Sequence, residues 1–143
     1  MAQGYYDLYN NGTIVNVSNL ITGSGNGYGG MYSNVFDLFT FCNALLVNQT
    51  LLSTKSLNIM QTFGAQDGVN RYGYGIMKKY VERGGDAGLG HSGRDLGYSA
   101  NMFYHPNKNV THAFVINYGT DAESDLRQVF AEFVEELLDL TLQ

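Results

Sequence analysis

The sequence predicts an α+β fold in which helices pack against an antiparallel sheet. Several short runs in the C-terminal half alternate apolar and polar residues with a period of two, which is typical of strands. The last apolar run instead repeats with helical spacing. Short connections join the strand runs, so an antiparallel meander of three strands is their simplest arrangement.

The N-terminal segment is expected to form a hairpin. The apolar runs 3–8 and 13–17 flank Asn11-Gly12, and Asn-Gly between two such runs is a strong turn signal. The glycine-rich segment Gly23–Gly30 follows and is expected to be a loop. It lacks the Lys-Ser/Thr ending of a phosphate-binding loop.

Two helices are expected next. Apolar residues spaced from Val35 to Leu46 lie on one face of a 3.6-residue period, so a helix should begin at Ser33 or Asn34 and end near Asn48. Ser53 can cap a second, shorter helix that runs to about Gln61. Cys42 lies on the apolar face of the first helix, where a small buried hydrophobe is expected, and a single cysteine excludes an internal disulfide.

The meander is assigned to the runs 72–82, 98–104 and 110–118. A polar turn is expected at 64–70, and a second turn at 105–109, where Pro106 is excluded from a central ladder. Gly73 and Gly75 lie on one face of the first run and leave it bare, which indicates close packing by a neighbour.

A long C-terminal helix should lie across one face of the sheet. Thr120 and Glu123 have the spacing of a capping box. The apolar stripe that follows is expected to be buried and consists of Leu126, Val129, Phe130, Phe133, Val134, Leu137 and Leu138. Burying these seven side chains would contribute roughly 10–20 kcal/mol before entropy is subtracted.

Composition narrows the class of protein. The chain of 143 residues has the length of one domain. A net charge of −5 with scattered basic residues argues against a nucleic-acid partner. No apolar run is long enough to span a bilayer. The three histidines lack the clustered spacing of a metal site, so neither a metal nor another cofactor is predicted.

The stretch from Gly88 to Phe103 is the candidate site. Glycines at 88, 90, 93 and 97 surround His91, and glycine permits tight turns and the close approach of backbone to a ligand. Such a histidine beside a strand is a reasonable place for chemistry. The alternative is a glycine-rich turn with an exposed histidine.

The order of motifs resembles the serine β-lactamase-related hydrolases, which include class C β-lactamases, D-Ala-D-Ala carboxypeptidases and esterases. The segment 29–41 resembles their Gly-Gly-x-x-Ser-x-x-x-Asp-Leu-x-x-Phe pattern, and Leu51-Leu52-Ser53 and Tyr72-Gly73-Tyr74-Gly75 follow in the same order. His91-Ser92-Gly93 resembles the His-x-Gly motif on the strand that lines the active site. The resemblance implies a partial β-lactamase/transpeptidase-like fold, with residues 1–143 forming a single unit from the C-terminal part of a larger domain.

The resemblance also implies roles for four residues. His91 would orient the substrate or modulate the proton relay, and Ser92 would hydrogen-bond a substrate carboxylate. Gly93 would let the strand approach the substrate, and the backbone N–H of Arg94 would contribute to the oxyanion hole. The substrate would be an acyl, peptide or β-lactam-type small molecule, and an extracytoplasmic location is suggested.

The attacking group of this family is absent from the sequence. The family's nucleophile lies in Ser-x-x-Lys, and no such pattern occurs here. Ser53 and Lys55 are only two apart and would not share a helix face. Tyr32-Ser33-Asn34 has the letters of the family's Tyr-x-Asn motif, but its neighbours match the later Gly-Gly segment. One hypothesis is therefore the C-terminal part of a serine hydrolase, inactive alone. The other is a non-catalytic binding module that self-associates through an exposed sheet edge.

Overall fold

The computed structural model describes residues 2–20, 30–66, 70–119 and 126–143. The helical elements are α1 (Val35–Cys42), the π-helix η1 (Asn43–Val47), α2 (Thr54–Met60), the 3-10 helix η2 (Val81–Asp86) and α3 (Leu126–Thr141). The strands are β1 (Tyr5–Tyr6), β2 (Val15–Asn16), β3 (Gly64–Gln66), β4 (Asn70–Tyr72), β5 (Met77–Lys79), β6 (Gly88–Asp95), β7 (Tyr98–His105) and β8 (Val110–Ile116).

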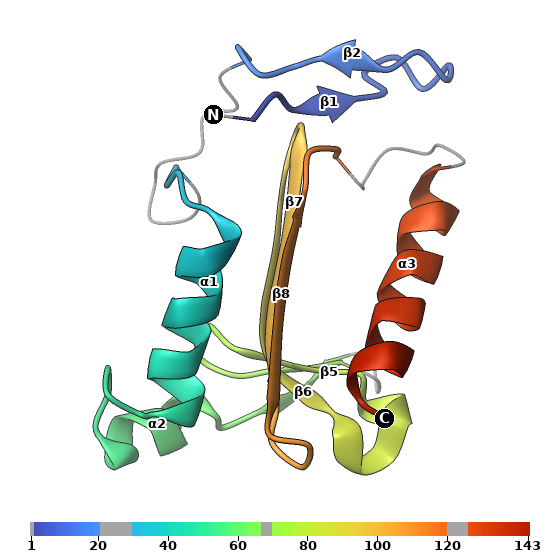
Figure 1. The fold of residues 1–143 in the computed structure, drawn as a ribbon. Coiled ribbons are helices and arrows are strands. Elements are labelled where there is room, and N and C mark those ends of the chain that lie inside the picture. Colours follow the sequence, from blue (N-terminus) through green and yellow to red (C-terminus); the bar gives the residue numbers. More distant parts are fainter. Residues whose placement is uncertain (1, 21–29, 67–69, 120–125) are drawn as a thin grey trace.

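The main sheet has six strands in the order β3-β4-β5-β6-β7-β8, and every neighbouring pair is antiparallel. The long strands β6, β7 and β8 form a meander that stands between α1 and α3 (Figure 1). The predicted α+β class and antiparallel meander are confirmed. The turn expected at 105–109 is also present, between β7 and β8.

The glycine-rich stretch around His91 is itself a strand, β6, and it replaces the run 72–82 as the neighbour of β7. Its glycines allow close strand contact. A side chain at Gly90 would collide with the Met102 carbonyl oxygen on β7. The alternative of a glycine-rich turn is therefore wrong, and the strand that the resemblance implies is present.

The segment between Gly64 and Val81 also differs from expectation. Part of the expected turn 64–70 belongs to the hairpin of β3 and β4, while residues 67–69 lie outside the described residues. The expected strand 72–82 is broken, because the chain turns between β4 and β5. Gly75 adopts φ +75°, and a side chain there would meet nothing within 4 Å. Gly73, in contrast, lies against the Met60 carbonyl, so only this glycine is required by close packing.

The first two predicted helices are confirmed. The Asn34 side chain accepts hydrogen bonds from the N–H groups of Phe36 and Asp37 and so caps α1. Helical backbone continues through η1 and ends at Asn48. Ser53 caps α2 by accepting from the Ser56 N–H.

Helices α1 and η1 cover one face of the sheet over β7 and β8 (Figure 1). The buried core on this face consists of Cys42, Leu45, Leu46, Leu57 and Ile76. Burial raises the pKa of the Cys42 thiol to about 11, as expected for a thiol that serves as a packing group.

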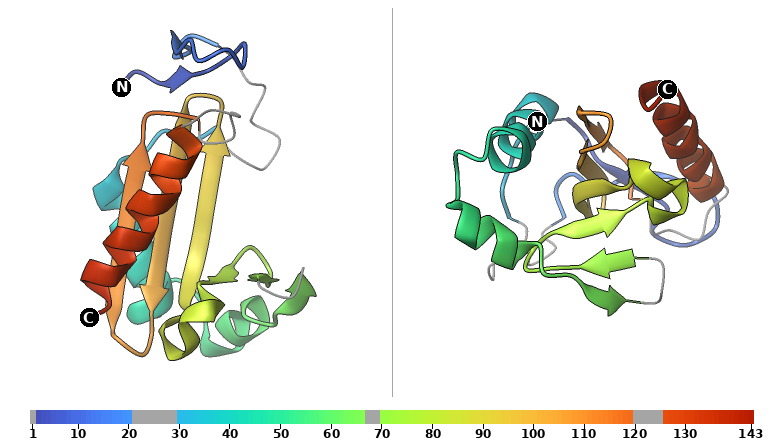
Figure 2. Two further views of the ribbon diagram at one scale, coloured as in Figure 1. Left: turned by 90° about the vertical axis from the view of Figure 1, so that its right-hand side faces the viewer. Right: turned by 90° about the horizontal axis from the view of Figure 1, so that it is seen from below.

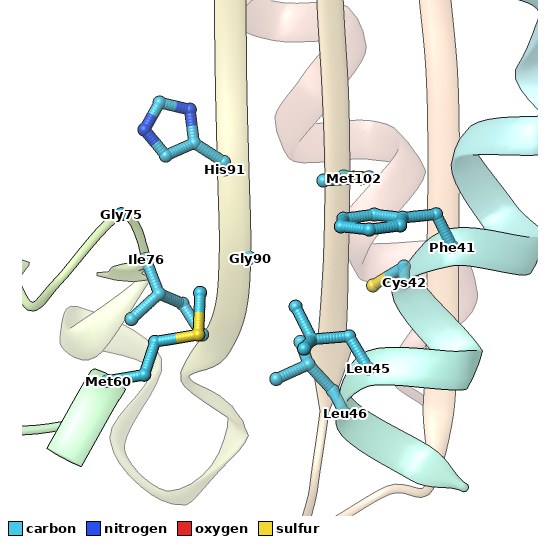
Figure 3. A pocket seen from close by; sticks show the side chains of 10 residues that line it. All are labelled: Phe41, Cys42, Leu45, Leu46, Met60, Gly75, Ile76, Gly90, His91 and Met102. Carbon is cyan, nitrogen blue, oxygen red and sulfur yellow. The ribbon is translucent and has the colours of Figure 1, made fainter. Parts of the chain in front are cut away.

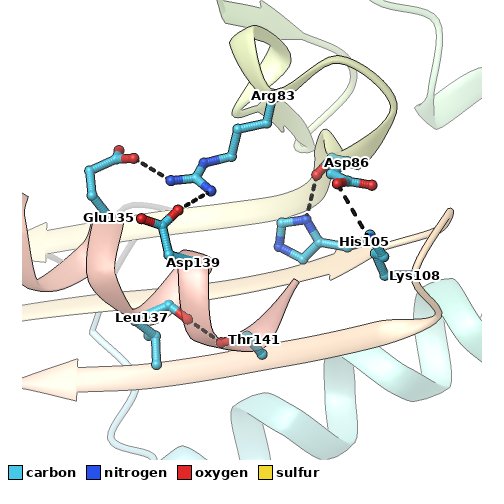
Figure 4. Close-up of polar contacts among 8 residues, drawn as sticks. All are labelled: Arg83, Asp86, His105, Lys108, Glu135, Leu137, Asp139 and Thr141. Carbon is cyan, nitrogen blue, oxygen red and sulfur yellow. Dashed lines mark hydrogen bonds and ion pairs between the residues drawn. The ribbon is translucent and has the colours of Figure 1, made fainter. Parts of the chain in front are cut away.

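Helix α3 covers the opposite face, as predicted (Figure 2). Phe133 packs edge-on against Phe114 of β8, and Phe130 lies against Tyr118. Figure 4 shows Arg83 of η2 donating to Glu135 at 2.5 Å and to Asp139 at 2.8 Å, which ties η2 to the helix. Both carboxylates are exposed, so these ion pairs contribute little, of order 1 kcal/mol or less.

Only part of the apolar face of α3 is buried. Leu138 is fully buried, whereas Val129 is 52% and Phe133 43% exposed. The expectation of seven buried side chains is wrong, because the sheet covers only one side of a broad apolar face. The capping box at Thr120 and Glu123 lies outside the described residues, as does most of the loop Gly23–Gly30.

The predicted N-terminal hairpin is present as β1 and β2. The Asp7 carboxylate accepts from the N–H groups of Asn11 and Gly12 and so holds the turn. Tyr5 then joins the hairpin to the end of β8, since its N–H donates to the Asn117 carbonyl at 3.1 Å. In the part of the chain that the structure describes, no helix combines the length and apolar character needed to cross a bilayer.

Candidate active site

Strand β6 extends beyond β5, its neighbour on the side away from β7. It pairs with β7 from Leu89 to Asp95, but its pairing with β5 spans only Gly88 to Gly90. From His91 onward, β6 therefore continues beyond the last residue paired with β5. A strand margin of this kind presents backbone N–H and C=O groups to a ligand.

The hydrogen bonds of β6 alternate in direction, and the turn fixes their phase. Strands β6 and β7 are joined by Leu96-Gly97, so Asp95 and Tyr98 are the hydrogen-bonded pair that closes a two-residue turn. The next residue, Arg94, then directs its N–H to the side away from β7. This is the direction that the predicted oxyanion-hole role of Arg94 requires.

His91 makes two polar contacts. Its Nδ1 lies 2.6 Å from the Ser92 carbonyl oxygen, and its Nε2 lies 2.9 Å from the hydroxyl of Tyr72. The Tyr72 and His91 rings also meet edge to face, with centroids 5.6 Å apart. The imidazole is thus held in place by the end of β4 and by its own strand.

Ser92 points to the other face of the sheet. Successive side chains alternate across a strand, and the Ser92 hydroxyl accepts from Lys79 Nζ at 3.3 Å, on the α3 face. Burial, followed by the charge of Arg94, lowers the pKa of Lys79. The structure therefore brings Ser92 together with Lys79 and separates its side chain from that of His91.

Gly93 shares the face of His91. A Cβ built at Gly93 would meet nothing within 4 Å, in contrast to the crowded Gly90. Packing in this chain thus does not demand a glycine at position 93, and the open space lies beside the imidazole.

A small apolar pocket of about 80 Å³ lies beside His91 (Figure 3). Side chains of α1 and η1, among them Phe41 and Leu45, form one wall, and Ile76 and Met60 form the other. Met102 of β7 lies between them. This volume is smaller than a cavity that holds benzene, so it suits a short alkyl group.

A second polar cluster lies buried on the α3 face. His105 Nδ1 is 2.7 Å from the Asp86 carbonyl, and His105 Nε2 is 3.1 Å from His112 Nδ1. His112 Nε2 is in turn 2.9 Å from the Asn101 side chain, which contacts the Tyr80 hydroxyl at 3.3 Å. Burial lowers the pKa of both imidazoles, that of His112 to about 4. His105 ends β7 and His112 lies in β8, and these adjacent strands bring the two rings together.

The residues that partly match the family's Ser-x-x-Lys and Tyr-x-Asn motifs have structural roles here. The Ser53 hydroxyl caps α2, and the Asn34 amide of Tyr32-Ser33-Asn34 caps α1. No group of three His, Cys, Asp or Glu side chains among the described residues could hold a metal ion.

Two contacts of the candidate site were not predicted. Tyr72 was assigned only to a strand and a motif, although it touches His91. Lys79 lies within the expected strand 72–82, and its contact with Ser92 has no counterpart in the sequence analysis. The Tyr72-Gly73-Tyr74-Gly75 motif was the available signal for the first contact, whereas Lys79 carried none.

The arrangement of strands and helices is shared with known proteins. The Beta-lactamase family model matches residues 2–133. The chain belongs to the Beta-lactamase family. This membership confirms the relationship to β-lactamase-related serine hydrolases inferred from the ordered motifs.

A solved structure of similar fold supports this assignment. The crystal structure of a D-stereospecific amidohydrolase from Streptomyces sp. is 29% identical in sequence and superposes with a TM-score of 0.69. The match covers 81% of this chain but 34% of that one, so the β-lactamase-family chain spans about a third of its structural relative. No curated protein sequence matches the chain.

Proposed function

We propose that this chain is the C-terminal part of a β-lactamase- or penicillin-binding-protein-like serine hydrolase. It would supply the strand that lines the acyl-transfer site. The observation that carries this proposal is the margin of β6, which runs past β5 with His91 beside a pocket and Arg94 N–H directed outward. Because the sequence lacks Ser-x-x-Lys, we expect the chain to have no acyl-transfer activity on its own.

In the complete site, a serine from outside this chain attacks the acyl carbonyl. The Arg94 N–H donates to the oxyanion that forms, and one such donor typically stabilises the transition state by about 3–4 kcal/mol. Open space at Gly93 admits the substrate backbone to the strand margin. His91 orients the substrate. Ser92 takes its proposed part in carboxylate binding only if the carboxylate reaches the face that holds Lys79.

The substrate class is an acyl compound of peptide, amide or β-lactam type. The relative of 29% identity is described as a D-stereospecific amidohydrolase, which favours an amide. The apolar pocket of about 80 Å³ adds room for a short alkyl side chain next to His91. Carboxypeptidase activity, a bacterial source and an extracytoplasmic location are parts of the same proposal and follow from the family.

Binding to the strand margin can be tested without catalysis. We expect an N-acyl-D-alanyl-D-alanine peptide to shift the backbone amide resonances of His91, Gly93 and Arg94 in ¹H–¹⁵N spectra of the chain. Gly93→Val should abolish these shifts because it fills the open space, while Gly64→Val, at another uncrowded glycine, should not. Shifts elsewhere, or none at millimolar peptide, would count against the site.

Self-association is the second candidate function. Met31 and Tyr32, just before α1, and Phe36 in its first turn are 91%, 84% and 78% exposed, and exposed apolar side chains so close in sequence favour a covering partner. Under the main proposal the remainder of a β-lactamase fold covers them. Light scattering distinguishes the two, because a stable dimer that dissociates on Phe36→Ser would favour the self-association module, and a monomer would favour the hydrolase part.

A further inference from the structure

Tyr72 is the side chain that the sheet places directly against His91. It ends β4 opposite Met77 of β5, and Met77 pairs with Gly90, the residue before His91. By strand alternation Tyr72 shares a face with Met77 and Gly90, so its ring reaches His91 past the first residue of β5 and not across the ladder. The hydroxyl oxygen lies 2.9 Å from His91 Nε2, and the ring planes are 82° apart.

The two contacts of His91 determine which of its nitrogens carries the proton. A backbone carbonyl can only accept, so the 2.6 Å contact to the Ser92 carbonyl requires a proton on Nδ1. In a neutral imidazole, Nε2 is then an acceptor. Tyr72 must donate its hydroxyl proton to it, and the hydrogen bonds run in one direction from Tyr72 through His91 to Ser92.

This direction decides which atom remains available to a ligand. The Nε2 lone pair is engaged by Tyr72, whereas the phenolic oxygen still has acceptor capacity. Tyr72 is 38% exposed, so a ligand at the margin of β6 can reach that oxygen. A peptide or amide substrate offers N–H donors that fit it.

We propose that Tyr72 is a positioning residue of the candidate active site. It holds His91 in the Nδ1-protonated tautomer, and its phenolic oxygen accepts a hydrogen bond from an N–H of an amide or peptide substrate. The substrate contact rests on the proposed function, whereas the control of the tautomer does not.

The tautomer is tested in the chain as it stands. Long-range ¹H–¹⁵N spectra above pH 8 should show His91 with a protonated Nδ1 and an unprotonated Nε2. Tyr72→Phe removes the donor and should move both nitrogen shifts toward a mixture of tautomers. Tyr74→Phe is the matched control, since Tyr74 lies on the same turn and is 70% exposed. Unchanged His91 shifts in a folded Tyr72→Phe variant would overturn the proposal.

The substrate contact is tested by titration with the same D-alanyl-D-alanine peptide. Tyr72→Phe should weaken binding by about three- to tenfold, the usual effect of losing one hydrogen bond, while Tyr74→Phe should not. Equal affinity of wild type and Tyr72→Phe would refute the contact. If the wild-type chain does not bind the peptide at all, the proposed function and the substrate contact both fail, and the spectra still decide the tautomer.

Discussion

His105 and His112 stack on adjacent strands with ring centroids 5.1 Å apart, and Nε2 of the first lies 3.1 Å from Nδ1 of the second. Both rings are buried beneath α3 and η2, with Tyr80 stacked against His105. The charges of Asp86 and Arg83 act on His105, and the Lys108 ammonium lies 3.9 Å from Asp86 (Figure 4). The pair thus joins the sheet to η2 through polar contacts.

Acid should destabilise the fold through this pair. Burial lowers the pKa of His112 from 6.5 to about 4, so between these values the unfolded chain binds more protons than the folded chain. Stability is therefore complete above about pH 6.5 and falls as the pH drops toward 4, by an amount on the order of 3 kcal/mol for His112 alone. Urea unfolding between pH 7.5 and 4 measures this slope. His112→Gln should flatten it, and an unchanged slope in that variant would rule out the assignment.

The same pair predicts the orientation of the Asn101 amide. The chain of contacts runs from the Asp86 carbonyl through His105 and His112 to the Asn101 side chain. If the Asn101 oxygen faced His112, each of the three contacts would need an imidazole N–H, but two neutral imidazoles carry only two. Placing the Asn101 nitrogen toward His112 removes the conflict, and the Tyr80 hydroxyl can then donate to the amide oxygen. We expect ¹⁵N spectra at pH 7.5 to show an unprotonated Nε2 on His112. A protonated Nε2 would show instead that the amide oxygen faces the ring.

Ile76 is expected to be essential for the core beside the candidate site. It is 1% exposed and packs with Leu45, Leu46 and Leu57, so Ile76→Ala should lower the free energy of unfolding by about 2–5 kcal/mol. Ile59→Ala, at a position 53% exposed on α2, is the matched control and should cost far less. Chemical denaturation checks both, and equal losses would mean that the core lies elsewhere.

Gly90 and Gly93, two of the three glycines of β6, should respond differently to substitution. Gly90→Ala introduces a Cβ against the Met102 carbonyl, which belongs to backbone and cannot move aside cheaply, so the free energy of unfolding should fall by roughly 1–3 kcal/mol. Gly93→Ala meets open space and should leave stability within about 0.5 kcal/mol. Thermal unfolding of both variants provides the comparison. A larger loss at Gly93 than at Gly90 would contradict the packing described for β6.

Local signals accounted for most of the fold. The caps at Asn34 and Ser53, the period of α1 and the alternation in β7 and β8 act over a few residues and are visible in sequence. The residues of 88–95 do not by themselves distinguish a turn from a strand, because glycine is common in turns, while Gly90 here admits the Met102 backbone from another strand. The number of buried side chains on α3 likewise could not be predicted, because it depends on how much of the helix the sheet covers.

In the candidate site, too, local motifs could be predicted from the sequence, whereas contacts between strands could not. His91 and Arg94 could be singled out because their motif is continuous in the sequence. Tyr72 and Lys79 could not, because they reach His91 and Ser92 only through strand pairing. The opposite orientation of the Ser92 and His91 side chains follows from strand alternation, and the Lys79 contact shows which face holds Ser92.

Intact-mass spectrometry of the chain after incubation with a penicillin and with a fluorophosphonate tests the central claim most directly. If this polypeptide lines an acyl-transfer site whose nucleophile lies outside it, neither reagent should add stoichiometrically. The penicillin should also hydrolyse no faster with the chain present than in buffer alone. A stoichiometric adduct that peptide mapping places on a serine of this chain, together with turnover of the penicillin, would contradict the account.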